Sequence, residues 1–368
     1  TLEFGLQARD LGLLAGGYFF GFSLTQLPMG HWLDQHGPKK VVLSFLGVAV
    51  LGCLAFSWAT DFYGLLMARV LIGVGVSACL MAPLTGYRRW LALEHQQRAN
   101  SWMLMTGALG MLASTLPVQW LLPIVGWRWI FVGLALLIVL SMALMTWQVP
   151  KWRLPEPAAT EPSKRVGILA SYKQVWMGMI AIFLYVGVEV STAGNLSEYL
   201  KSNLNVATRD AAPFISLFWA SLMIGRWTSS AGSFNVSETM KKALRFVLPL
   251  AAFGVYLAVN TKAGYDVAKF YPYVGMIAIL VIVDYLSKGN PARQLLIYSL
   301  CGITALVIGI FSGGMTAAMA FVSVGLFCST LWPCIFTLAI TGLGSKMSKG
   351  SNFLIMMIMG GGFVSVLQ

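Results

Sequence analysis

Four polar side chains recur at helical spacing inside an otherwise apolar stretch of the chain. They are Tyr185, Glu189, Thr192 and Asn195, which follow one another at intervals of four, three and three residues. On an α-helix this spacing places all four on one face. The hydroxyl and amide groups of such a face can hold a small polar solute, and Glu189 is a candidate proton carrier. The alternative is a hydrogen-bond network that only joins neighbouring helices.

A second polar group lies near the carboxyl end, in LFCSTLWPCIFTLAITGLG at 326–344. Its candidates for a solute-binding wall are Thr330, Trp332 and Thr337. Trp332 either stacks on the solute or fills space between helices. Pro333 lacks a backbone N–H and is expected to kink its helix, which suits a moving gate. The amide of Gln119 interrupts another apolar stretch and is a subsidiary candidate for lining the same site.

The composition indicates that membrane helices position these side chains. Of the 368 residues, 58% are hydrophobic and 10% are charged, whereas soluble domains carry about 25% charged residues. The net charge of +12 lies mostly in short connectors, so we interpret it as a topology signal and not as a nucleic-acid-binding surface. We find no metal-ligand spacing, no nucleotide-binding pattern and no catalytic cluster, and therefore expect neither a cofactor nor an enzyme.

Stretches of about 20 apolar residues predict twelve transmembrane helices. Five precede a linker that is rich in proline and charge, and seven follow it. We therefore expect an N-terminal helical bundle over 1–148, a cytoplasmic linker over 149–172 and a C-terminal bundle over 173–368. The predicted helices cover 11–30, 41–60, 64–86, 99–122, 128–148, 173–197, 213–232, 243–261, 271–287, 294–312, 315–341 and 351–368.

Positive charge alternates between successive connectors. Lysine and arginine gather after every second predicted helix, beginning with the first, and the intervening connectors carry little excess positive charge. Because cytoplasmic connectors are enriched in lysine and arginine, this pattern places both ends of the sequence on the opposite, periplasmic side. Asp284, near one cytoplasmic helix end, is expected to pair with Lys288 one turn later.

The polar knot GHWLDQHGPKK, at 30–40, resembles the signature G-x-x-x-D-x-x-G-x-K/R-K/R of the major facilitator superfamily of transporters. The matching residues are Gly30, Asp34, Gly37, Lys39 and Lys40. Gly30 would permit close helix packing, and Gly37 with Pro38 would form a tight turn. The resemblance implies a cytoplasmic latch that favours an outward-facing state. An ordinary charged turn is the alternative.

Arg69, in RVLIGVGVSA at 69–78, resembles part of the fourth-helix pattern of the same family and joins the predicted latch group. The resemblance implies an all-α fold of two helical bundles. It also implies that the sequence begins just before the second family helix, with the usual first and last helices missing. The segments 243–261 and 271–287 would then be two additional helices of the second half.

Four stretches of the second half are similar to the fucose and glucose/galactose permease branch of this family. Gly225 and Arg226 resemble the second-half counterpart of the latch. The resemblance implies a monomeric sugar:proton symporter of the bacterial inner membrane that works by alternating access in the lipid bilayer. Two alternatives stay open, namely a transporter-like receptor or non-transporting remnant, and a facilitator for another small organic solute. The four similar stretches are 183–200, 219–230, 326–344 and 350–368.

Overall fold

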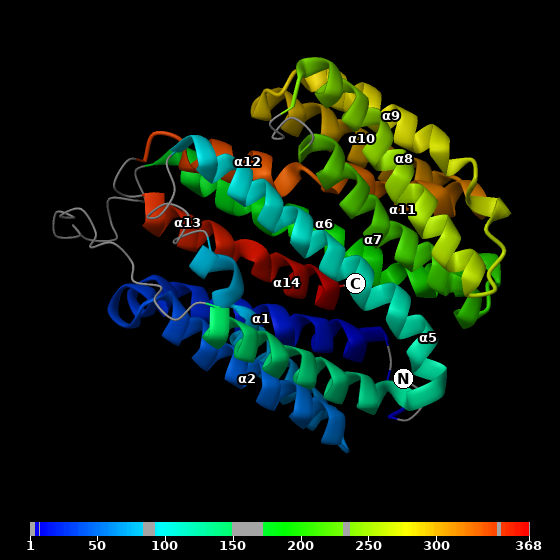
Figure 1. The fold of residues 1–368 in the computed structure, drawn as a ribbon. Coiled ribbons are helices and arrows are strands. Elements are labelled where there is room, and N and C mark those ends of the chain that lie inside the picture. Colours follow the sequence, from blue (N-terminus) through cyan, green and yellow to red (C-terminus); the bar gives the residue numbers. More distant parts are fainter. Residues whose placement is uncertain are drawn as a thin grey trace. The chain divides into compact units, whose positions relative to one another are not determined.

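The computed structural model describes residues 4–6, 8–83, 93–148, 172–230, 236–343 and 347–367, and all regular structure within them is helical (Figure 1). The first half contains α1 (Ala8–His36), α2 (Pro38–Trp58), α3 (Phe62–Val76) and α5 (Leu93–Gln148). The second half contains α6 (Lys173–Leu204), α7 (Thr208–Ser230), α8 (Glu238–Lys262), η3 (Ala268–Phe270), α9 (Tyr273–Ser287), α10 (Pro291–Phe311), α11 (Gly314–Cys328), α12 (Leu331–Ile340), α13 (Met347–Met356), η5 (Met357–Met359) and α14 (Gly360–Leu367). The predicted all-α fold class is confirmed.

Nine helical segments among the described residues are long and apolar enough to cross a membrane. Three of the twelve predicted segments, 11–30, 99–122 and 213–232, are not among these nine. Two of them fall in α1 and α7, which bury polar side chains such as Gln26 and Ser221 inside the protein. Those side chains lower the hydropathy of a helix without touching lipid. The exact number of twelve stays a prediction.

The chain forms two compact units. Unit 1 comprises Thr1–Gln96, Leu122–Ser191 and Leu338–Gln368, and unit 2 comprises Gln97–Leu121 and Thr192–Thr337. The long helix α6 supplies its first part to unit 1 and its last part to unit 2. The predicted division into two bundles separated by the linker 149–172 stays a prediction, and most of that linker lies outside the described residues.

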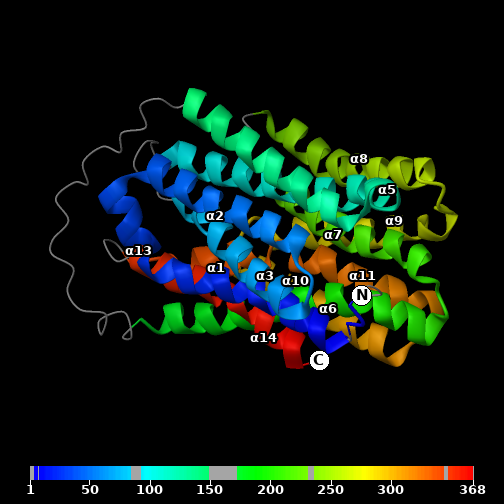
Figure 2. The same cartoon turned by 90° about the horizontal axis from the view of Figure 1, so that it is seen from below.

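In unit 1, α1 packs against α13 and α14 (Figure 1) and against α3 (Figure 2). Glycines allow these helices to approach closely. A Cβ atom at Gly75 of α3 would lie 2.5 Å from Cα of Ala49 in α2, and a Cβ at Gly362 of α14 would lie 2.9 Å from Cα of Gly16 in α1. No side chain fits at such distances, so small residues set the spacing of these helices.

The second part of α5 also belongs to unit 1. The backbone of Gly126 has φ 75° and ψ 162°, which interrupts the helix at the boundary predicted between 99–122 and 128–148. Arg128 then donates hydrogen bonds to the carbonyl oxygens of Ser57 and Ala59, each 3.1 Å long, at the C-terminal end of α2. Phe131 packs 4.2 Å from the ring of Phe56. An arginine and an aromatic pair thus fasten the last helix of the first half to α2.

In unit 2, α7 packs against α11 and α8, and α10 packs against α11 (Figure 2). The core is built from large aromatic side chains. Tyr256 of α8 donates a 2.9 Å hydrogen bond to the Pro213 carbonyl, and the hydroxyl groups of Tyr273 and Ser221 lie 2.7 Å apart. Because a buried hydroxyl without a partner is costly, these bonds fix α8 and α9 against α7.

Candidate functional site

The predicted polar stripe lies on one helix, α6. Glu189 is 7% exposed and Tyr185 is 8% exposed. The Tyr185 hydroxyl donates a hydrogen bond to Oε2 of Glu189, one helical turn further along. A buried carboxyl in a membrane helix costs free energy unless it is hydrogen-bonded or protonated, so the hydrogen bond from Tyr185 offsets part of this cost. The predicted proximity of these two side chains is therefore observed. Proton carrying by Glu189 stays a prediction.

The other two members of the stripe lie in more open surroundings. Thr192 is half-buried and Asn195 is exposed. Both belong to the part of α6 that packs in unit 2, whereas Tyr185 and Glu189 belong to unit 1. The stripe therefore changes along α6 from a buried carboxyl–hydroxyl pair to accessible hydroxyl and amide groups. Solute binding by Thr192 and Asn195 stays a prediction.

Glycines of α14 hold the buried part of α6 in place. A Cβ atom at Gly361 would lie 2.9 Å from Cγ2 of Val190 and 3.1 Å from Cγ1 of Val186. A Cβ at Gly360 would overlap the backbone carbonyl of Phe183. This close packing leaves α6 little room to shift against α14 near Glu189.

The second candidate group surrounds a break between α11 and α12. Helix α11 ends at Cys328 and α12 begins at Leu331, so the predicted single helix over 315–341 is interrupted by two residues. Ser329 retains helical backbone angles, φ −54° and ψ −36°. Its carbonyl would accept the backbone N–H of residue 333 in a continuous helix, but proline has none. Pro333 thus explains where the helix breaks.

Arg226 of α7 supplies the donor that Pro333 lacks. Its Nε donates to the Ser329 carbonyl oxygen over 3.4 Å. The preceding residue, Gly225, lies directly against the Ser329 side chain, which a Cβ atom at Gly225 would overlap. Gly225 and Arg226 therefore contact the helix break itself. Their predicted gating role is untested, but this contact gives it a physical basis.

Thr330 lies at the same break. Its side chain is 1% exposed, and its hydroxyl has no hydrogen-bond partner within the described part of the chain. An unpartnered buried hydroxyl keeps its capacity to bind a polar group. Among the predicted wall residues, Thr330 is therefore the one with an open hydrogen-bonding position.

The remaining predicted wall residues differ in their surroundings. Trp332 is half-buried and stacks on Phe336, with ring centres 4.9 Å apart and planes 13° apart. One face of its ring is thus covered by protein, which favours the packing role. Thr337 is exposed. The backbone of Gln119 lies in α5, but its side chain is outside the described residues.

The polar knot at 30–40 forms the turn between α1 and α2. Gly37 has φ 76° and ψ 157°, a conformation open to glycine, and Pro38 is the first residue of α2. A Cβ atom at Gly30 would lie 2.8 Å from Nδ2 of Asn352 in α13. The tight turn and the close packing are both observed in unit 1.

One charged member of the knot, Lys39, contacts the end of α5. Lys39 Nζ donates to the Thr146 carbonyl oxygen over 3.3 Å, in the last turn of α5, where a cation is favoured by the helix dipole. Asp34 and Lys40 are exposed. Arg69 of α3 lies 5.6 Å from the ring centre of Phe56, which offsets part of the cost of its charge. Latch function stays a prediction for all of these residues.

Asp284 does not make the predicted pair with Lys288. Its Oδ2 lies 3.6 Å from Nε of Arg245 in α8, and its Oδ1 lies 3.5 Å from Nε2 of Gln294 in α10. Lys288 adopts a left-handed backbone conformation, φ 51°, that ends α9. Helix α9 therefore ends before Lys288, so the one-turn spacing does not bring Lys288 beside Asp284. Arg245 of α8 supplies the cation instead.

These features, namely a buried carboxyl–hydroxyl pair, a proline helix break and a glycine turn between α1 and α2, belong to a protein of membrane helices. The sequence model described as Major Facilitator Superfamily matches residues 1–366. The chain belongs to the major facilitator superfamily. Members of this superfamily are transporters, which confirms that the chain is a multi-pass membrane transporter and not an enzyme.

Relatives within the superfamily are named as sugar transporters. The glucose/galactose transporter of Brucella abortus (strain 9-941) is 26% identical over an aligned length of 385 residues, gaps included. The aligned region covers 99% of this chain and 79% of that protein. The L-fucose-proton symporter of Escherichia coli (strain K12) is 35% identical over 80 residues, or 22% of this chain and 18% of that protein. The predicted resemblance to this branch is confirmed.

A solved structure shares the fold. The crystal structure of a variant of the Escherichia coli fucose:proton symporter is similar with a TM-score of 0.67 and 18% identity, covering 96% of this chain and 82% of that one. At this identity the likeness concerns the fold alone. The major facilitator fold predicted from the motifs is thus confirmed.

One buried amide of this facilitator-superfamily transporter was not predicted as a site residue. Gln26 of α1 is fully buried, and its Nε2 donates to the Ser77 carbonyl over 3.1 Å, just after the end of α3. Its Oε1 has no hydrogen-bond partner among the described residues. The sequence contains a pattern that could have indicated this residue, because Ser23 and Gln26 are polar residues three positions apart in an apolar helix.

Proposed function

We propose that this transporter moves a sugar together with a proton, by alternating access, across the inner membrane of a bacterium. The relatives named glucose/galactose transporter and L-fucose-proton symporter support the solute class and the coupling ion. In alternating access the solute site opens to one side of the membrane at a time, and rocking helical bundles provide the opening.

The observation that carries this proposal is the buried pair of Glu189 and Tyr185 on α6. A carboxyl group can bind and release a proton, and a neighbouring hydroxyl can stabilise its charged form when the proton leaves. Glu189 would therefore load and release the proton, and Tyr185 would orient the carboxyl. The open hydrogen-bonding position of Thr330 and the accessible groups of Thr192 and Asn195 would bind sugar hydroxyls.

The remaining sequence predictions complete the proposal. The functional division would follow the sequence, with bundles over 1–148 and 173–368 joined by the linker 149–172 on the cytoplasmic side. The alternation of positive charge supports a periplasmic position for both ends of the sequence. The transporter would act as a monomer.

Uptake into proteoliposomes tests the proposal. The purified full chain is reconstituted, and entry of radiolabelled galactose, glucose and fucose is measured with and without an inward proton gradient. We expect accumulation of at least one sugar against its gradient only when the pH gradient is present. Glu189→Gln, which keeps the size and the hydrogen-bond acceptor but cannot ionise, should abolish accumulation and retain counterflow exchange.

Glu198→Gln is the matched control, because Glu198 lies on the same helix but is exposed. It should accumulate sugar like the parent. If Glu189→Gln also accumulates sugar normally, Glu189 is not the proton carrier. If the parent shows neither accumulation nor counterflow of any tested sugar, the proposal of sugar transport is wrong.

A further inference from the structure

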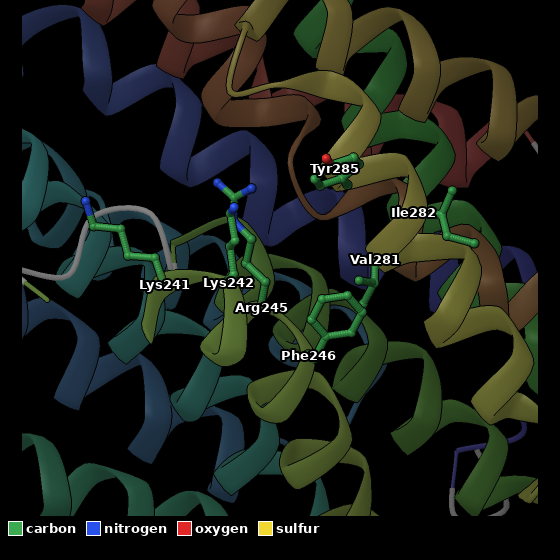
Figure 3. A pocket seen from close by; sticks show the side chains of 7 residues that line it. All are labelled: Lys241, Lys242, Arg245, Phe246, Val281, Ile282 and Tyr285. Carbon is green, nitrogen blue, oxygen red and sulfur yellow. The ribbon is translucent and has the colours of Figure 1, made fainter. Parts of the chain in front are cut away.

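A pocket between α8 and α9 is not used by the transport mechanism. Its volume is about 350 Å³, and it lies wholly within unit 2. Figure 3 shows Phe246 of α8 beside Val281 of α9, with the Lys242 and Arg245 side chains extending from α8 toward a common side. The lining residues are Lys241, Lys242, Arg245, Phe246, Val281, Ile282 and Tyr285.

The pocket is lined almost wholly by apolar atoms and has a cationic rim at one end. The cationic rim consists of Lys241, Lys242 and Arg245, in the first turns of α8. Asp284, 3.6 Å from Arg245, offsets one of these charges, and the exposed side chain of Lys242 presents another. The apolar part consists of Phe246 and the α9 residues of the lining. A ligand that fits this division has an anionic head and a hydrocarbon body.

The position of the pocket along the helices matches the edge of a membrane. At a rise of about 1.5 Å per residue, Lys241 and Arg245 lie about 5 and 10 Å along the helix axis beyond the first residue of α8. Val281 and Tyr285 lie in the last two turns of α9, whose C-terminal end adjoins this end of α8. The cations therefore lie at the level of lipid headgroups, and the apolar residues reach toward the hydrocarbon core.

The apolar part continues onto an exposed surface. Phe246 and Ile282 are each 58% exposed and Tyr285 is 68% exposed. Further along α8, Val247 and Leu250 are 57% and 48% exposed. In a membrane protein this surface faces acyl chains, so a hydrocarbon chain whose head lies at the cationic rim can follow α8 without leaving lipid.

We propose that this pocket binds an anionic phospholipid. The phosphate group would lie among Lys242, Arg245 and Lys241, and the upper part of an acyl chain would lie against Phe246, Val281 and Ile282. Basic pockets between membrane helices provide the charge complementarity that anionic headgroups require, and a zwitterionic headgroup gains less from it. The inference does not depend on which solute the protein transports.

Lipid binding is measured by native mass spectrometry of the full chain in detergent. Phosphatidylglycerol and phosphatidylcholine with identical dioleoyl chains are titrated separately, and the affinity of the first bound lipid is compared. We expect the parent to bind phosphatidylglycerol at least tenfold more tightly. The double variant Lys241→Gln/Lys242→Gln should lose about 25-fold of the phosphatidylglycerol affinity, at about fivefold per basic residue near a lipid surface.

The matched control is Lys201→Gln/Lys262→Gln, which removes the same charge from two exposed lysines outside the pocket. It should bind phosphatidylglycerol like the parent. Equal losses in the two double variants would show that only net charge matters and would overturn the site. If the pocket variant elutes as an aggregate, Lys242→Gln alone, at an exposed side chain, takes its place with an expected loss of about fivefold.

Two further arms separate a lipid from a soluble anion. Inorganic phosphate and glycerol phosphate at millimolar concentration should not displace the bound phosphatidylglycerol, because they lack the hydrocarbon body. Phe246→Ser should weaken phosphatidylglycerol binding although it changes no charge. Displacement by either soluble anion, or unchanged binding in Phe246→Ser, would mean that the pocket is an anion site and not a lipid site.

Discussion

The contact of Arg226 with the helix break between α11 and α12 gives a sharp test of how this transporter is held together. Arg226 Nε donates to the Ser329 carbonyl oxygen, which Pro333 leaves without its usual backbone donor. The perturbation is a double-mutant cycle of Arg226→Met and Pro333→Ala. The first substitution removes the side-chain donor, and the second introduces a backbone N–H at the position that a continuous helix would use.

The geometry sets the expected magnitudes. A hydrogen bond from a charged group contributes about 1.5–3 kcal/mol, and the 3.4 Å length of this one places it at the lower end. We expect Arg226→Met to destabilise the protein by about 1–2 kcal/mol. Pro333→Ala should be neutral or stabilising, since proline in the first turn of α12 costs little but alanine can extend the helix. In the Pro333→Ala background, Arg226→Met should cost about 1 kcal/mol less, because the new N–H satisfies the carbonyl.

The cycle is measured by unfolding the four proteins with sodium dodecyl sulfate in mixed micelles, followed by tryptophan fluorescence. A coupling of about 1 kcal/mol between the two substitutions supports the exchange of donors. Strictly additive costs would refute the reasoning, because they would mean that Arg226 stabilises the protein through something other than the orphan carbonyl. Galactose uptake by the same four proteins then shows whether a continuous helix slows transport.

Two further predictions concern unit 1. Gly75→Ala would place a Cβ 2.5 Å from Cα of Ala49, so it should destabilise the protein by about 1–3 kcal/mol. The control is Gly47→Ala on α2, where a Cβ would have no atom within 4 Å and should not destabilise the protein. Equal unfolding midpoints for the two variants would contradict the packing argument. Gln26→Leu removes the open amide oxygen, and if that oxygen accepts a sugar hydroxyl, the KM for uptake should rise about tenfold, the loss of one hydrogen bond. An unchanged KM would show that the amide is only structural.

The sequence located the helices well but underestimated the lengths of α1, α6 and α7. The first predicted helix covers 11–30, whereas α1 continues to His36 through most of the polar knot. Hydropathy detects the part of a helix that lies in hydrocarbon, and the backbone continues its hydrogen bonding into the headgroup region, where polar residues are equally helical. The breaks were better defined, since Gly37 and Gly126 both take positive φ values that favour glycine.

The partner of a polar side chain was predictable within one helix but not between helices. The spacing of Tyr185 and Glu189 was enough to predict that they meet, because a helix places residues four apart side by side. Asp284 was assigned to Lys288 by the same rule, but its partner is Arg245, 39 positions earlier in the sequence. Gln26 was overlooked for a related reason, since its partner at Ser77 comes from another helix. Spacing along one helix does not determine which neighbour it packs against.

This distinction has a consequence for how the proposed proton step would work. The Tyr185–Glu189 hydrogen bond lies within α6, so a rigid movement of that helix leaves it intact. The Arg226–Ser329 bond joins residues 103 positions apart on different helices, so a shift of α7 against the break would lengthen it. Release of a proton from Glu189 therefore has to follow from a change in the surroundings of α6, such as the arrival of water or solute. Movement between helices would instead change the Arg226–Ser329 hydrogen bond at the helix break. Tyr185→Phe should accordingly alter the pH dependence of uptake, and Arg226→Met should alter its maximal rate.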